Sequence, residues 1–168
     1  MPLTTRALLD MTATDRLADL FDTHQNRLFL LALRLCSDRE EARDLVQETF
    51  LRAARHPESV AGEPWLVRTL VNLCRDRYRR LAVRSKAREE LTREERSDPE
   101  EIQVARVTVQ AALSRLAPRR RAAIVLCEIE GRPVKEVARL LGVAEVTVRW
   151  HLLAARRELA RLLQGARS

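Results

Sequence analysis

The stretch Pro133–Leu159, PVKEVARLLGVAEVTVRWHLLAARREL, has the pattern of a helix-turn-helix, in which two helices pack at a steep angle around a tight turn. Ala138 is small enough to let the two helices approach closely, and Gly142 suits the turn between them. The small core that the helices share is predicted to contain Val137, Leu141, Val143, Val148 and Leu152. An ordinary helical hairpin with solvated charges is the alternative interpretation.

The start of the second predicted helix is where a helix-turn-helix reaches base edges in the major groove. Residues 132–168 carry eight basic and three acidic side chains, which favours contact with phosphates. Trp150 has two interpretations: it contacts a thymine methyl or a sugar edge, or it packs back against Leu116. The candidate DNA-reading residues are Glu145, Thr147, Arg149, Trp150 and Leu153, with Arg156 and Arg157 as further base or phosphate contacts.

A second basic surface is predicted upstream, in the segment PWLVRTLVNLCRDRYRR at 64–80. Leu66, Leu70 and Leu73 fall on one stripe of a helix, which predicts a buried side. A second stripe, at spacings of four, three and four, holds Arg68, Asn72, Arg75 and Arg79. The segment carries five basic residues and one acid, and Trp65 and Tyr78 could stack on unpaired bases. A solvated arginine face is the alternative.

The acidic stretch EARDLVQETF at 41–50 contrasts with a net charge of +7. On a helix, four of its residues turn inward: Leu45, Val46, Thr49 and Phe50. Four others cluster outward: Glu41, Asp44, Gln47 and Glu48. This outward cluster is either a solvated face or a surface that docks on a protein. A capping box, Ser37–Glu40, predicts that the helix begins at Asp38, and His56-Pro57 ends it near Arg55.

Composition predicts an all-α fold, because 33% of residues are charged, only 4% are aromatic, and there are only four glycines and six prolines. The predicted organisation is two small helical domains joined by a flexible charged linker. The linker, AVRSKAREELTREERS at 82–97, has too few apolar residues to form a core. The expected divisions are an N-terminal tail at 1–14, a first domain at 15–81, the linker at 82–97 and a second domain at 98–165, which opens on a capping box at Asp98–Glu101.

Catalytic and metal-binding functions are not expected. The histidines, His24, His56 and His151, lack metal-ligand spacing, and there is no glycine-rich phosphate loop. We interpret the three cysteines as reduced core thiols, which favours a cytoplasmic protein: Cys36, Cys74 and Cys127. No cofactor, metal or catalytic residue is predicted. The apolar run at 28–36 is too short to span a bilayer, so no membrane insertion is expected.

Taken together, the segments resemble bacterial RNA polymerase sigma factors of the extracytoplasmic-function (ECF) group, which contain the second and fourth sigma regions. The resemblance covers about 150 residues. EARDLVQETFLRAAR is similar to the core-polymerase-binding segment, and PWLVRTLVNLCRDRYRR to the promoter-melting helix. The fourth region is similar to LAPRRRAAIVLCEIEGRPVKEVARLLGVAEVTVRWHLLAARREL.

This resemblance implies a dissociable subunit of RNA polymerase. Asp44, Gln47 and Glu48 would meet the clamp of the largest catalytic subunit, and the fourth region would contact the flap of the second large subunit. Asn72 and the loop at 56–63 would help to read the melted minus-ten strand, and the helix-turn-helix would read the minus-thirty-five element of promoter DNA. An anti-sigma protein that holds the chain inactive is a further implied partner.

Two positions depart from the family pattern. Arg132-Pro133 replaces the Ser or Thr that often caps the first helix of the reader, and Val146-Thr-Val-Arg-Trp150 replaces Gly-Thr-Val-Lys-Ser. A helix-turn-helix repressor or activator that dimerises through its N-terminal half is the rival hypothesis. It explains the DNA module but gives the acidic cluster and the melting-type helix no role.

Overall fold

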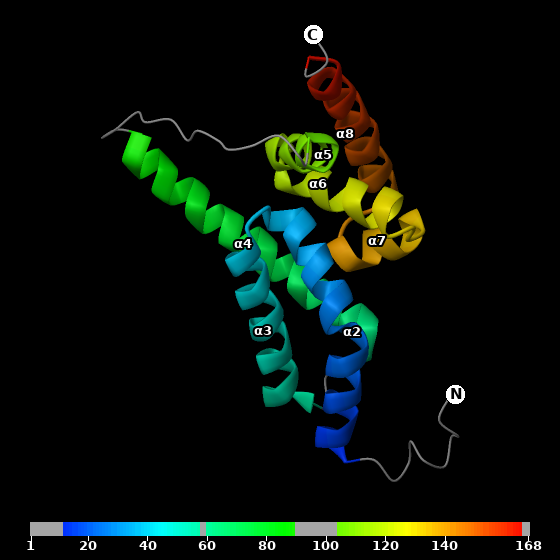
Figure 1. Ribbon diagram of the computed structural model, residues 1–168. Coiled ribbons are helices and arrows are strands. Elements are labelled where there is room, and N and C mark those ends of the chain that lie inside the picture. The colour runs from blue at the N-terminus through cyan, green and yellow to red at the C-terminus, as the bar shows by residue number, and fades with distance from the viewer. Residues whose placement is uncertain (1–11, 58–59, 90–103, 166–168) are drawn as a thin grey trace.

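The structure is a computed structural model that describes residues 12–57, 60–89 and 104–165, and these residues form helices and turns without a strand (Figure 1). The predicted all-α class is therefore confirmed. No helix in these ranges is long and apolar enough to cross a bilayer. In chain order the elements are α2 (Ala13–Cys36), α3 (Arg39–Arg55), α4 (Glu63–Glu89), α5 (Val104–Arg115), α6 (Pro118–Ile124), the π-helical turn η3 (Val125–Ile129), α7 (Val134–Leu141) and α8 (Glu145–Gly165).

The N-terminal half consists of α2, α3 and α4, which pack side by side. Their apolar stripes meet in a core, and the predicted inward residues of α4, namely Leu66, Leu70 and Leu73, are all buried. The inward side of α3 is buried as predicted as well, including Phe50, whose ring meets Phe21 of α2 edge-on at 4.8 Å between centroids. The 3.6-residue periodicity thus assigned the buried sides of these helices correctly.

The junction between α2 and α3 differs from the predicted capping box. Ser37 has a left-handed backbone (φ 66°) and closes α2, with its N–H donating to the Leu33 carbonyl at 2.9 Å. Asp38 caps α3 instead, and its carboxylate accepts from the Glu41 N–H at 2.8 Å. An N-cap residue needs an extended backbone, which Asp38 has and Ser37 lacks. The predicted Ser37 cap is therefore wrong, and α3 starts at Arg39.

The helix α4 continues to Glu89, although its predicted end was near Leu81. Residues 82–89, the first part of the predicted linker, are thus helical, and the remainder of that linker and the box at 98–101 lie outside the described residues. The extension has a local cause: residues 82–89 contain Ala, Arg, Lys and Glu, which favour helices, and neither Gly nor Pro. Figure 1 shows this end of α4 reaching beyond both groups of helices.

The C-terminal half consists of α5 to α8. Pro118 opens α6 at a first-turn position that tolerates proline. The chain then widens into η3, where the Glu130 N–H donates to the Val125 carbonyl at 2.9 Å, and Gly131 turns the chain with φ 67°. Helices α7 and α8 follow and fall within or just beyond the stretch Pro133–Leu159, in which the helix-turn-helix was predicted.

The two halves pack against each other instead of standing apart. Helices α5 and α6 lie against α2, and α7 lies against α4 (Figure 1). Their buried apolar residues form one continuous cluster that reaches from Leu28 to Ala155. The sequence predicted two domains but left their relative placement open.

Candidate nucleic-acid interface

The helix-turn-helix is formed by α7 and α8 as predicted. Gly142 adopts φ 65° in the turn, a left-handed conformation that favours glycine, and the Val143 N–H donates to the Ala138 carbonyl at 3.0 Å. Val137 and Val148 are fully buried between the helices. Of the predicted shared core, Leu152 is also buried, whereas Leu141 and Val143 are partly buried. This packing fixes the start of α8 against α7.

The predicted reading residues lie on or beside the outward side of α8. Trp150 is 61% exposed, so it does not pack back against Leu116, which is buried elsewhere. The Arg120 guanidinium lies 5.9 Å from the centre of the Trp150 ring. The remaining candidates are placed as follows: Glu145 and Arg149 form an ion pair at 3.1 Å, Thr147 is half-buried, Arg156 pairs with Glu128, and Arg157 is exposed.

The predicted second stripe of α4, here called the α4 stripe (Arg68, Asn72, Arg75 and Arg79), runs along one side of that helix. Arg68 and Arg79 are exposed, whereas Asn72 and Arg75 are half-buried. The Arg75 Nε atom is buried and has no hydrogen-bond partner among the described residues. Trp65 packs partly against the core, so only part of its ring surface is accessible. The stripe therefore exists, but its middle is only partly exposed to solvent.

The middle of the α4 stripe faces the C-terminal half. Arg68, Asn72 and Arg75 share a recess with Arg119 and with residues 140–143 at the end of α7. A wider groove nearby lies between α4 and α7, and its lining residues are Ala61, Pro64, Trp65, Arg68, Pro133, Lys135, Glu136, Arg139 and Leu140. The arrangement thus places cations from both halves around this recess and this groove. The sequence analysis did not predict Arg119, Lys135 or Arg139 as candidate site residues. Only tertiary packing brings these three cations beside α4.

The outward side of α3, here called the α3 face (Asp44, Gln47 and Glu48), is accessible. Asp44 and Gln47 are exposed, and Glu48 forms a surface ion pair with Arg52 at 2.9 Å. Glu41 does not belong to this face, because it pairs with Arg77 of α4 at 2.8 Å. Leu51 does belong to it and is 51% exposed. Sequence reasoning missed Leu51, although its spacing of seven from Asp44 was a usable signal.

Burial controls the protonation of the cysteines and of His151. Desolvation raises the pKa of the Cys36, Cys74 and Cys127 thiols, most strongly for Cys74, so they remain protonated near neutral pH. All three are free, as predicted. Burial, and after it the charges of Arg119 and Arg120, lower the pKa of His151, which favours its neutral form. These groups behave as packing residues, and among the described residues no cluster of three His, Cys, Asp or Glu could hold a metal ion.

Two family models match this chain, one in each half. A family model for Sigma-70 region 2 matches residues 20–84, and one for Sigma-70 region 4 matches residues 106–159. The chain is 38% identical over 157 residues to the ECF RNA polymerase sigma factor SigM of Mycobacterium tuberculosis, covering 90% of this chain and 80% of SigM. The chain belongs to the ECF RNA polymerase sigma factors.

Other ECF sigma factors agree with this assignment. SigE of Mycolicibacterium smegmatis is 36% identical over 160 residues, which cover 89% of this chain and 62% of SigE, so the chain spans less than two thirds of that relative. Two solved structures share the fold. The sigma factor RpoE in complex with the anti-sigma factor NepR from Bartonella quintana has a TM-score of 0.71 at 23% identity, covering 88% of this chain and 96% of RpoE. CnrH in complex with the cytosolic domain of CnrY has a TM-score of 0.63 at 27% identity, covering 89% of this chain and 88% of CnrH.

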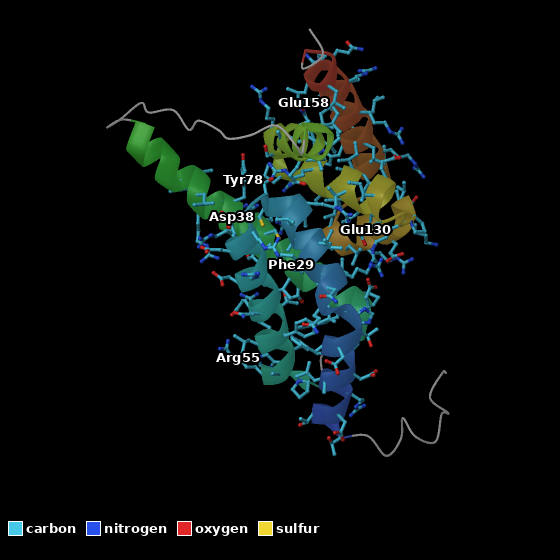
Figure 2. All side chains as sticks on the ribbon, in the orientation of Figure 1. Phe29, Asp38, Arg55, Tyr78, Glu130 and Glu158 are labelled. Atoms are coloured by element: carbon cyan, nitrogen blue, oxygen red, sulfur yellow. The ribbon has the colours of Figure 1, made fainter. Side chains whose placement is uncertain are left out.

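Within this ECF chain, polar contacts hold regions 2 and 4 together. The Glu130 carboxylate, whose side chain is 7% exposed, lies between Arg27 at 3.1 Å and Arg34 at 3.0 Å. Figure 2 labels Glu130 near the junction of the two halves. Arg132 is buried and donates both to Glu63 at the start of α4 and to Glu136 of α7. Arg132 therefore braces the first turn of α7, which has no side-chain cap, as its Arg132-Pro133 start predicted.

We expect Glu130→Ala to loosen the packing of the two regions. The change removes two ion pairs that join them and leaves Arg34 partly buried without its partner, at a cost of about 1–2 kcal/mol. The proportion of separated molecules should rise about tenfold. Small-angle X-ray scattering in low salt should show a larger radius of gyration than for the unaltered chain.

Glu128→Ala is the matched control, because Glu128 pairs with Arg156 inside region 4 and does not cross the junction. It should leave the radius of gyration unchanged. Equal radii for both variants in low and high salt would show that Glu130 does not hold the regions together.

Proposed function

We propose that this chain is an alternative sigma factor that binds core RNA polymerase and directs promoter-specific initiation of transcription. The observation that carries the proposal is that one chain presents an acidic face on α3, a basic stripe on α4 and a helix-turn-helix, in the two matched sigma regions. The proposed domains are 15–81 and 98–165. The site of action is the cytoplasm, where core polymerase and promoter DNA are found, and the chain itself supplies no catalytic group.

The α3 face has the chemistry of a protein-docking surface. Its carboxylates repel DNA, and Leu51 offers an exposed apolar centre with Asp44 and Glu48 beside it. Interfaces commonly combine a small apolar centre with a charged rim that sets orientation and association rate. The proposed contact is the clamp of the largest catalytic subunit, with Asp44, Gln47 and Glu48 at its rim. The flap of the second large subunit is the proposed contact of region 4.

The α4 stripe has the chemistry of a surface that binds single-stranded DNA. Arg68, Arg75 and Arg79 supply cations along one side of the helix, and Asn72 supplies both donors and an acceptor for a base edge. Trp65 offers a partly accessible ring for stacking, a contact that contributes about 1–3 kcal/mol per base. Extruding a base costs a few kcal/mol, so stacking and cations together are of the right size to hold the melted minus-ten strand.

DNA cannot occupy the middle of the α4 stripe while α7 lies against it. Arg75 and Asn72 become fully accessible when region 4 moves off α4. We therefore expect the free chain to bind promoter DNA poorly, and binding to core polymerase to separate the regions. The same packing suits control by an anti-sigma protein. CnrH, at 27% identity, is solved with a protein bound, and we extend such control to this chain.

Reconstitution with core polymerase tests the proposal. Mixed with core enzyme and genomic fragments, the full chain should produce discrete run-off transcripts, and core enzyme without it should not. The chain alone should retard the same fragments only weakly in a gel-shift assay. Tight binding of a defined operator by the chain alone, with no transcript from the mixture, would instead indicate a repressor or activator that dimerises through α2 to α4.

A further inference from the structure

The outward side of α8 carries an apolar stripe that is largely exposed to solvent. Val146, Trp150 and Leu153, spaced by four and three residues, are 69%, 61% and 48% exposed. The opposite side of the same helix already supplies the buried contacts, through Val148 and Leu152. The three exposed residues are here called the α8 stripe. Arg120 and His151 lie beside the Trp150 ring, but much of the apolar surface of the three residues is open to solvent and is therefore available to a ligand.

Cations border the α8 stripe. Arg149, Arg157 and Arg161 are exposed on the same helix. From α6, the Arg120 guanidinium approaches the Trp150 ring. The acids nearby are already paired: Glu145 bonds Arg149 at 3.1 Å, and Glu158 bonds Arg120 at 2.8 Å. An apolar strip with cations beside it and along its continuation is complementary to the major groove of duplex DNA, in which base edges lie between two rows of phosphates.

The base edges in the major groove offer one apolar group among the four standard bases, the C5 methyl of thymine. Val146 and Leu153 can neither donate nor accept hydrogen bonds, so they distinguish bases only through apolar contact. Trp150 adds a large ring surface between them on the same side. We propose that the α8 stripe reads thymine methyls, which makes thymine, on either strand, the base that this chain selects in the upstream promoter element. The inference rests on the proposed function, because it assigns base specificity to the same helix-turn-helix.

The exposed arginines of α8 that are unpaired in the described part of the chain argue against a protein as the occupant of this stripe. Arg149 and Arg120 already pair with carboxylates of α8, whereas Arg157 and Arg161 are exposed and have no carboxylate partner among the described residues. A protein that covered the stripe would have to neutralise these two arginines, whereas DNA phosphates do so without further contacts. The following test can detect a protein occupant. If a protein covers the stripe, removal of thymine methyls should not change the affinity of the holoenzyme for promoter DNA.

Deoxyuridine differs from thymidine only by the missing C5 methyl, which makes it a selective probe. A promoter is first selected from a randomised duplex library by the holoenzyme of core polymerase and the full chain. Each thymine of the upstream element is then replaced by deoxyuridine in turn. At two or three neighbouring base pairs the replacement should weaken holoenzyme binding about fourfold, the value for one buried methyl. In holoenzyme carrying Trp150→Ala, the ratio of thymidine to deoxyuridine affinity should fall to about one at one of these positions. In holoenzyme carrying Leu153→Ala, the ratio should fall to about one at another of them.

Two variants serve as controls. Leu30→Ala removes a leucine of the same exposure, 48%, from α2 and should change neither affinity nor ratio. Arg157→Ala should lower affinity for all duplexes alike and preserve the ratio, as a phosphate contact does. If every deoxyuridine duplex binds and is transcribed like its parent, or if Trp150→Ala leaves the ratio intact, the inference is overturned while the sigma function stands. If no duplex is selected or transcribed, the proposed function itself fails.

Discussion

The double variant Asp44→Lys, Glu48→Lys is expected to lose at least about tenfold in affinity for core RNA polymerase while keeping its fold. Asp44 is exposed on α3, and Glu48 makes only a surface pair with Arg52, at 2.9 Å. Pairs of that kind contribute little to stability, so helical content and melting temperature should be nearly unchanged. Affinity for core enzyme should fall, because reversed charges at the edge of a docking surface repel the groups that the native carboxylates attract. Fluorescence anisotropy of labelled chain titrated with core enzyme measures the effect.

A control with the same change in net charge separates a local effect from a global one. Asp19→Lys, Asp22→Lys reverses two exposed acids on α2, outside the α3 face. This variant should bind core enzyme with an affinity close to that of the unaltered chain. Leu51→Ala should weaken binding without any change of charge, because Leu51 lies 51% exposed on the α3 face. If the Asp44, Glu48 variant binds core enzyme normally, α3 is not the docking surface, whatever the family of the chain.

Replacing Arg121 with Ala is expected to destabilise the chain by about 3–5 kcal/mol. Arg121 is only 5% exposed, and its guanidinium donates to the carbonyls of Leu35, Ser114 and Leu116. Leu35 lies in the last turn of α2, Ser114 lies in the last turn of α5 and Leu116 lies between α5 and α6, so one side chain joins the two halves. Its removal leaves buried acceptors unpaired and opens a cavity. Burial also lowers the pKa of Arg121, which reflects the cost of desolvating its charge.

Urea unfolding followed by circular dichroism would measure this loss. Arg121→Met fills much of the same volume but donates no hydrogen bonds. It therefore distinguishes the effect of the cavity on stability from the effect of the lost hydrogen bonds, and it should still be destabilising. Arg115→Ala removes an exposed arginine near the end of α5 and should change the free energy of unfolding by less than about 0.5 kcal/mol. Equal stability of the Arg121 and Arg115 variants would contradict the bridging role.

Local patterns were sufficient to predict most helices and their buried sides. Leu66, Leu70 and Leu73 recur at helical spacing, and all three are buried as this spacing predicts. Helix ends were predicted less well. Ser37 and Asp38 are both good capping residues, and the left-handed backbone of Ser37 at the end of α2 leaves Asp38 as the residue that can cap α3. The end of α4 was missed because a charged, glycine-free segment is equally compatible with helix and with coil.

The candidate surfaces were predicted as stripes of residue types, but their accessibility was not. Trp150 could face outward or inward on its spacing alone, and only the packing of α6 and α8 leaves it exposed. Glu41 shares the pattern of Asp44 and Glu48, yet Arg77 of the neighbouring helix pairs with it. Arg121 is one of three successive arginines in the sequence, and no local feature marks it as the buried one.

The sequence by itself determined an all-helical chain, the sides of each helix that are buried, the helix-turn-helix and the family to which these segments belong. Only the tertiary structure decided that regions 2 and 4 pack together, that α7 covers the middle of the α4 stripe, and that Glu130, Arg132 and Arg121 join the two. The physical reason is that periodicity reports whether a side chain is buried, not which element buries it. The joining contacts connect residues as far apart as Arg27 and Glu130, 103 positions along the chain, whose pairing no local spacing encodes.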